Sequence, residues 1–80
     1  MSFGAAQSRG ARGLLGMTQA ELASKSGVSL RTIAHFEAGE RQPIPANLAA
    51  LQRALESAGV EFITENGGGP GVRLKRKAKR

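Results

Sequence analysis

The 80-residue sequence predicts a mainly α-helical fold of four helices followed by a two-stranded β segment. Three features predict it. Hydroxyl residues stand where two of the helices would begin, in the position of N-caps. Glycines follow the short amphipathic segments, where a helix ends in a left-handed conformation. After Gly59 the helical spacing gives way to two short runs of β-branched and aromatic residues around a glycine-rich loop.

The first helix is expected over residues 5–16. Its apolar anchors are Ala6, Leu14 and Leu15. Gly10 and Gly13 weaken this helix, since each costs roughly 1 kcal/mol relative to alanine in a helix interior. Its start is the least defined boundary, because residues 1–7 are weakly structured by composition.

The second helix is expected to begin after Thr18, a hydroxyl residue in the N-cap position. Glu21 follows three residues later, which is the spacing of a capping box. The helix runs to about Ser26, and Gly27 ends it because glycine adopts the left-handed conformation without steric cost. Its inward candidates are Ala20, Leu22 and Ala23.

Ser29 is the second N-cap, and a third helix is expected over residues 30–38, with Gly39 as its stop. One side of this helix carries Ile33, Phe36 and Glu37. The outward residues are Leu30, Arg31, Thr32 and His35. The third helix therefore has one side for the core and one side for contacts with another molecule.

The fourth helix is expected over residues 45–58, because Pro45 suits the first turn of a helix. Its single apolar stripe consists of Leu48, Leu51, Leu55 and Ala58. Strands are expected at 60–63 and 72–74, and the glycine cluster 67–71 between them lacks the pattern of a phosphate-binding loop. Because an isolated hairpin is marginally stable, this one must pack on the helical core or on a second copy of the chain.

The formal net charge of +6 is concentrated at the C-terminal end. The basic residues before Arg73 balance the six Glu, so the first 72 residues are formally neutral. The excess consists of Arg73, Lys75, Arg76, Lys77, Lys79 and Arg80. Such a tail points to a polyanion such as nucleic acid, and a solubilising or disordered end is an equally good interpretation.

The composition excludes several function classes. The sequence has no Cys, no Asp and one His, which removes disulfides, thiolate zinc sites and most acid–base pairs. We therefore expect no catalytic residue, no metal and no cofactor. The lack of Cys fits a reducing compartment, the cytoplasm. Because the sequence has no long apolar run, we expect no membrane span and no signal peptide.

The most informative segment is 19–38, where two short helices are joined by a tight turn at Gly27. Ala23 is small where the two helices would cross. The angle between the helices would be filled by Leu22, Val28, Ile33 and Phe36. This is the pattern of a helix-turn-helix, whose second helix enters the major groove of DNA.

The stretch TQAELASKSGVSLRTIAHFEAGE resembles the helix-turn-helix of phage-repressor and Cro-like (XRE-type) regulators. The matching residues are Thr18, Gln19, Leu22, Ala23, Gly27, Val28, Ser29, Ile33, Phe36, Glu37 and Gly39. The resemblance covers about residues 9–58, and the ending AGVEFI…GVRL is similar to that of short bacterial regulators. It implies a four-helix Cro/C1-repressor-like domain over residues 1–59. We further expect a β segment at 60–74 for dimerisation or packing and, from the run of charge, a disordered basic tail at 75–80.

The resemblance also implies a DNA-binding site. The residues that would read bases are Leu30, Arg31, Thr32 and His35. The residues that would bind phosphates are Thr18, Gln19, Ser29 and Arg41, and Lys75, Arg76, Lys77, Lys79 and Arg80 would add non-specific contacts. Unpaired N–H groups at helix N-termini attract anions, and an arginine suits a bidentate contact to guanine.

Each base-reading assignment has an alternative. Arg31 could instead face a phosphate or solvent, His35 could be an ordinary exposed residue, and Leu30 could pack against its neighbours. In the family an acid at the position of Glu37 pairs with an arginine of the first helix, which corresponds to Arg12 here. The resemblance thus implies a structural ion pair.

The sequence therefore predicts a sequence-specific regulator of transcription, a repressor that binds double-stranded DNA as a homodimer. The alternative is an antitoxin-type DNA-binding module whose C-terminal segment binds a protein partner. An RNA-binding role is less well supported, since the only aromatic residues are Phe3, Phe36 and Phe62.

Overall fold

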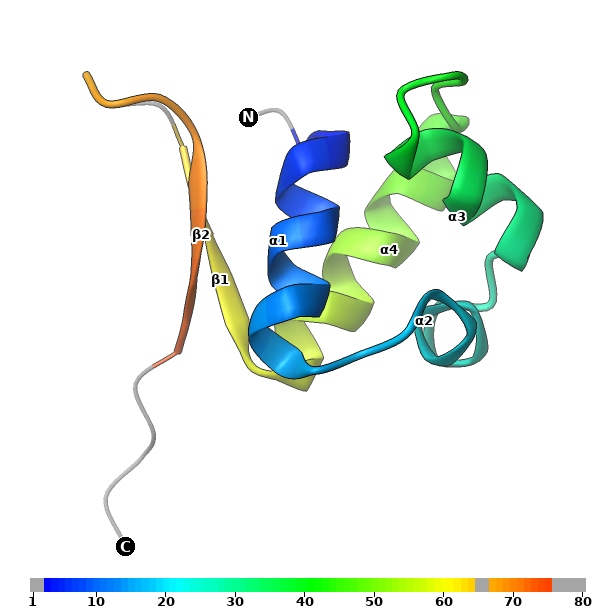
Figure 1. Cartoon of the computed structure of the whole chain (residues 1–80), viewed down its shortest axis with the longest axis horizontal. Coiled ribbons are helices and arrows are strands. Elements are labelled where there is room, and N and C mark those ends of the chain that lie inside the picture. Colours follow the sequence, from blue (N-terminus) through cyan, green and yellow to red (C-terminus); the bar gives the residue numbers. More distant parts are fainter. Residues whose placement is uncertain (1–2, 65–66, 76–80) are drawn as a thin grey trace, which may run out of the picture.

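The computed structural model describes residues 3–64 and 67–75 (Figure 1). The elements are α1 (Ala5–Leu15), α2 (Gln19–Ser26), α3 (Leu30–Glu37), α4 (Pro45–Ala58), β1 (Val60–Ile63) and β2 (Gly71–Leu74). The mainly helical fold with a C-terminal two-stranded sheet is confirmed, and each predicted boundary lies within one residue of the observed one. Most of the predicted basic tail lies outside the described residues, namely Arg76, Lys77, Lys79 and Arg80.

The predicted helix caps are present. The Thr18 hydroxyl accepts a hydrogen bond from the Glu21 N–H at 3.0 Å, and the Glu21 carboxylate accepts one from the Thr18 N–H at 2.9 Å. The Ser29 hydroxyl accepts from the Thr32 N–H at 3.1 Å. Gly27 ends α2 with a φ of 78°, in the left-handed region. These caps fix the angle at which α3 follows α2.

The core lies between the helices and extends under β1. Its fully buried apolar side chains are Ala11, Leu22, Ile33, Leu51, Leu55 and Val60. Ala23 is partly buried and packs against this core, as expected for a small residue in the helix pair.

The β-hairpin packs on α1 of the same chain. The two strands are antiparallel, with Phe62 opposite Val72 and Glu61 opposite Arg73. A side-chain carbon built at Gly10 would lie 3.3 Å from a Val72 methyl group, so the glycine allows β2 to approach α1 closely. The Gln7 amide also donates a hydrogen bond to the Gly71 carbonyl at 2.9 Å. Gly10 lowers the intrinsic stability of α1, but a side chain at this position would be crowded against β2.

The expectation of a weakly structured start is wrong from Phe3 onward. Phe3 is 7% exposed, and its ring centroid lies 5.7 Å from that of Phe36 and 5.0 Å from that of Phe62. The Gln7 side chain accepts a hydrogen bond from the Gly4 N–H at 3.0 Å at the start of α1. Phe3 therefore anchors the chain between α3 and β1.

The expected inward positions Ala6, Leu14 and Ala20 are also wrong, because all three are exposed. The buried face of α1 consists of Gln7, Ser8 and Ala11, with Leu15 partly buried. Two of these residues are polar and find hydrogen-bond partners inside the fold, so the apolar pattern did not mark the inward face of α1.

Gly27 and Gly13 form a matched pair for a stability test. Gly27→Ala should destabilise the fold by about 1 kcal/mol, because alanine is strained at a φ of 78°. Gly13→Ala should stabilise it by about 0.5–1 kcal/mol, because Gly13 lies within α1 and a side-chain carbon there meets nothing within 4 Å. Thermal unfolding followed by circular dichroism measures both. Shifts of the same sign would contradict the assigned backbone roles.

Candidate nucleic-acid interface

The N-termini of α2 and α3 lie next to the outward side of α3, where the sequence predicts contacts with DNA. Capping occupies the N–H groups of Glu21 in α2 and Thr32 in α3. Among the described residues, the main-chain N–H groups of Gln19 and Ala20 in α2, and of Leu30 and Arg31 in α3, have no hydrogen-bond acceptor. Free N–H groups and the positive end of the helix dipole favour an anion at such positions.

The outward side of α3 carries the predicted base-reading residues. Leu30 is 48% exposed, Arg31 is exposed, and Thr32 and His35 are half-buried. Arg31, Thr32 and His35 line a hollow of about 320 Å³ together with Arg41 and Pro43 of the loop that follows α3. The structure thus brings three predicted base-reading residues and one predicted phosphate-binding residue around one hollow, and Leu30 lies outside it.

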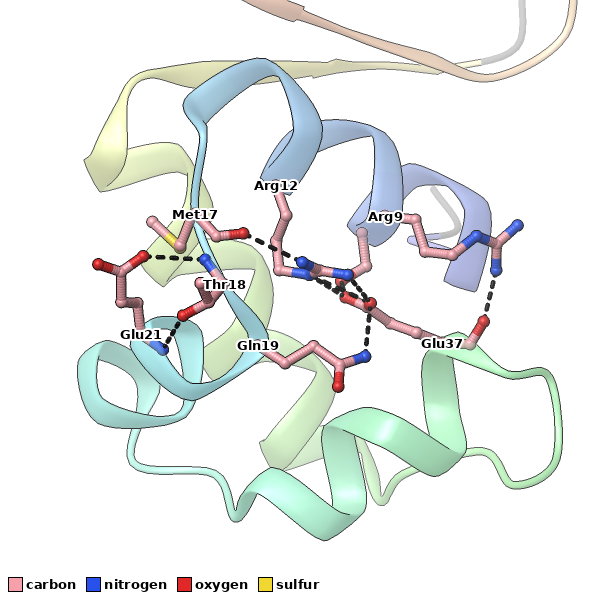
Figure 2. Close-up of polar contacts among 8 residues, drawn as sticks. Arg9, Arg12, Met17, Thr18, Gln19, Glu21 and Glu37 are labelled. Atoms are coloured by element: carbon pink, nitrogen blue, oxygen red, sulfur yellow. Dashed lines mark hydrogen bonds and ion pairs between the residues drawn. The ribbon is translucent and has the colours of Figure 1, made fainter.

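Behind this surface lies the ion pair between Arg12 and Glu37 (Figure 2). Glu37, the last residue of α3, is 3% exposed. The Arg12 Nε lies 3.1 and 3.0 Å from the two carboxylate oxygens, and its Nη2 lies 2.5 Å from Oε1. The ion pair that the family resemblance implies is therefore present.

Two further side chains donate to the same carboxylate. The Ser8 hydroxyl donates to Glu37 Oε2 at 2.5 Å, and the Gln19 amide donates to Oε1 at 3.1 Å. Ser8 and Arg12 belong to α1, whereas Gln19 is the first residue of α2. We call Ser8, Arg12, Gln19 and Glu37 the Glu37 cluster; it joins α1, α2 and the end of α3.

The cluster keeps its charges. Burial is the largest single influence on the pKa of Glu37 and by itself would raise it. Hydrogen bonds from Arg12, Ser8 and Gln19 and the charge of Arg12 together outweigh burial, so the pKa lies below its ordinary value of 4.5. The pKa of Arg12 is raised, mainly by its hydrogen bonds to Glu37. Both side chains are therefore ionised at neutral pH.

Two members of this network, Ser8 and Arg9, were not predicted from the sequence. Ser8 lies one helical turn before Arg12, and this spacing of four residues could have identified it as a partner. Arg9 donates to the main-chain carbonyl of Glu37 and so satisfies a free carbonyl at the end of α3. The Arg12 guanidinium also donates to the Met17 carbonyl at 3.0 Å, which fixes the turn between α1 and α2.

Ser29 and Lys75, two of the residues predicted to contact phosphates, have local partners. Besides capping α3, the Ser29 hydroxyl donates to the Thr32 hydroxyl at 2.9 Å. Lys75, the one residue of the 75–80 tail within the described part, is exposed and donates from Nζ to the Glu56 carbonyl at 2.8 Å. Its side chain thus contacts the end of α4.

The capped helix pair with its αL glycine and exposed second helix defines a helix-turn-helix protein. A helix-turn-helix family profile matches residues 9–62, more than half of the sequence, and the chain belongs to this family, of the Cro/C1 type. It is a DNA-binding regulatory domain family, which is not typically enzymatic. Comparison with curated protein sequences gives no match.

Neither a metal-binding cluster nor a membrane-spanning helix is found in the described part of the chain. Within residues 3–64 and 67–75, no group of three His, Cys, Asp or Glu side chains is placed to hold a metal ion. No helix in that part of the chain is both long enough and apolar enough to cross a membrane.

The lowered pKa of Glu37 predicts acid sensitivity. Below about pH 4.5 the unfolded chain takes up a proton that the folded carboxylate still excludes, so the free energy of unfolding falls until the folded carboxylate is also protonated. Above that pH the contribution of Glu37 is fully present. We expect Glu37→Gln to lower the Tm at neutral pH by the equivalent of about 3 kcal/mol and to lose part of this acid dependence.

Thermal unfolding at a series of pH values from neutral to about pH 3 measures this effect. Glu40→Gln is the control, because Glu40 is exposed and outside the cluster, and it should retain the acid dependence of the wild type. Parallel pH profiles for the wild type and Glu37→Gln would contradict the assignment.

Proposed function

We propose that this protein is a transcriptional repressor that binds its operator as a homodimer, with α3 in the major groove. The observation that carries the proposal is the exposed outer side of α3, flanked by the free N-terminal N–H groups of α2 and α3. An α-helix fits the width of the major groove, where each base pair presents a distinct pattern of donors and acceptors. The Glu37 cluster behind α3 holds this helix at a fixed angle to α2.

In this proposal the first turns of α3 read the bases. Arg31 donates two hydrogen bonds to a guanine, and the exposed Leu30 contacts a thymine methyl group. Thr32 and His35 complete the base-reading set from the same side of the helix. Arg31 and His35 share the hollow with Arg41, so a backbone phosphate near Arg41 lies beside the bases that α3 reads.

Phosphate contacts fix the position of α3 but carry no sequence information. We assign them to Thr18, Gln19, Ser29 and Arg41, and the first two adjoin the free N–H groups of α2. The basic residues from Lys75 to Arg80 add contacts that do not depend on sequence.

The segment 60–74 offers a surface for dimerisation. The Lys75 N–H donates to the Gly59 carbonyl at 2.8 Å, and Arg73 lies opposite Glu61 two residues along. Because hydrogen-bonded pairs alternate along an antiparallel ladder, the main-chain groups of the odd-numbered residues of β2 are the ones that bond to β1. The N–H and C=O groups of Val72 and Leu74 then point away from β1. Antiparallel pairing of β2 with the same strand of a second copy would satisfy them about a two-fold axis.

Exposed apolar side chains lie at the same place. Gln7 contacts Gly71 and Gly10 faces Val72, so α1 and β2 run side by side in the same direction (Figure 1). This arrangement places Leu14 and Leu74 at the same end of the pair, where they are 45% and 53% exposed. Their burial between two copies would support the strand pairing.

The test of function is selection of bound duplexes from a random DNA library by the full chain at moderate salt. A two-fold symmetric motif is expected, with half-sites about 10 base pairs apart or at a multiple of that spacing. Arg31→Ala should relax the preference at one position of each half-site, at a cost of roughly 1–3 kcal/mol there. Salt-sensitive binding without any enriched motif would contradict the proposal and favour the antitoxin-type module with a protein partner.

The test of dimerisation uses two matched substitutions of exposed apolar residues. Leu74→Lys should weaken the dimer at least about tenfold, because both copies lose a buried leucine side chain. Ile44→Lys is the control, since Ile44 is 63% exposed and lies at the start of α4. Sedimentation velocity without DNA measures the dissociation constants. Equal constants for the two variants, or a monomeric wild type, would contradict this interface.

A further inference from the structure

We propose that Glu37 is a positioning residue for DNA binding, which acts by fixing the side-chain amide of Gln19 for contact with a backbone phosphate. The inference rests on the proposed function, because it concerns how the same interface holds DNA. It assigns to Glu37 a role beyond its ion pair with Arg12. Ser8 and Arg12 stabilise the carboxylate, and the carboxylate in turn orients the side-chain amide of Gln19 at the start of α2.

Glu37 occupies a position that is unfavourable for a carboxylate unless its partners compensate. A carboxylate at the end of a helix opposes the helix dipole. Its burial also carries a desolvation penalty, which the hydrogen bonds from Arg12, Ser8 and Gln19 and the charge of Arg12 offset in the folded protein. Glu37 is nevertheless 3% exposed at the end of α3, with every buried side-chain polar atom of the described residues hydrogen-bonded.

The carboxylate determines which way the Gln19 amide points. An ionised carboxylate only accepts hydrogen bonds, so it faces the NH₂ group of the amide and repels the amide oxygen. One N–H of Gln19 is accordingly directed at Glu37 Oε1 at 3.1 Å. Rotating the amide by half a turn would place two oxygens against each other, so the amide has a single favoured orientation.

This orientation leaves donors at the start of α2. The second N–H of the Gln19 amide has no acceptor among the described residues, and neither have the main-chain N–H groups of Gln19 and Ala20. Figure 2 shows the Gln19 side chain extending from the start of α2 across to the Glu37 carboxylate. Three donors in one helical turn suit a phosphate, whose oxygens only accept.

The sign of the effect separates positioning from simple electrostatics. Glu37→Gln removes a negative charge near DNA, and charge alone would make binding tighter. If Glu37 positions Gln19, the same variant binds more weakly, because its neutral amide no longer fixes the orientation of Gln19. The preferred sequence remains the same, since a phosphate carries no sequence information.

The experiment is a double-mutant cycle in the full chain, with the affinities for a specific and a random duplex measured at a temperature where every variant is folded by circular dichroism. We expect Glu37→Gln to weaken both affinities roughly fivefold in the wild-type background, equivalent to one hydrogen bond. In the Gln19→Ala background we expect a change below about twofold.

Glu40→Gln is the matched control, since it makes the same change of charge at an exposed residue outside the Glu37 cluster and should not weaken DNA binding. Equal weakening by Glu37→Gln in both backgrounds, or tighter binding in both, would overturn the positioning role. Failure of the wild type to bind any duplex would overturn the proposed function and the inference with it.

A second measurement does not depend on the folding of a variant. In the free wild-type protein, NMR relaxation of the Gln19 side-chain amide should show an order parameter near that of the backbone, about 0.85. The side chain of Gln42, which is exposed in the loop before α4, provides the mobile reference. A Gln19 amide as mobile as that of Gln42 would overturn the inference.

Discussion

The structure depends on one buried carboxylate. Glu37 is the last residue of α3. Its two carboxylate oxygens accept hydrogen bonds from α1 and α2, and its main-chain carbonyl accepts one from Arg9. Because a chain of 80 residues has a thin apolar core, packing alone fixes helix angles weakly. Directional bonds to a single group supply the missing geometry. The angle between α2 and α3, which a helix-turn-helix needs, is therefore set by polar contacts as well as by the apolar core.

Polar contacts of this kind also explain why the inward face of α1 is partly polar. This helix uses Ser8 to reach Glu37 and Gln7 to reach the Gly71 carbonyl, so one polar face serves the helix pair and the hairpin together. Gly10 brings β2 close enough for the second contact. The helix thus links the proposed DNA-binding surface to the proposed dimer surface, and Leu14 is exposed at the same end of the α1–β2 pair as Leu74.

Local signals in the sequence predicted the elements well. The Thr18 capping box, the Ser29 cap and Gly27 each act through neighbours within a few residues, so their spacing alone locates the helices. Burial of Phe3, Gln7 and Ser8 depends on contacts more than 25 residues away, which no local pattern records. The family resemblance supplied the Arg12–Glu37 pair but not the bond from Gln19 that joins this pair to the surface.

The distribution of charge gives these fixed donors their importance. The first 72 residues are formally neutral, so the helix-turn-helix region has little excess charge with which to attract DNA. In the proposed function, its affinity depends on oriented donors, namely the free N–H groups of α2 and α3 and the Gln19 amide. Donors of this kind are effective only when their directions are held, because a mobile amide loses in entropy what it gains in bonding. A buried carboxylate that orients one of them is consistent with a protein that separates recognition by its helices from attraction by its basic end.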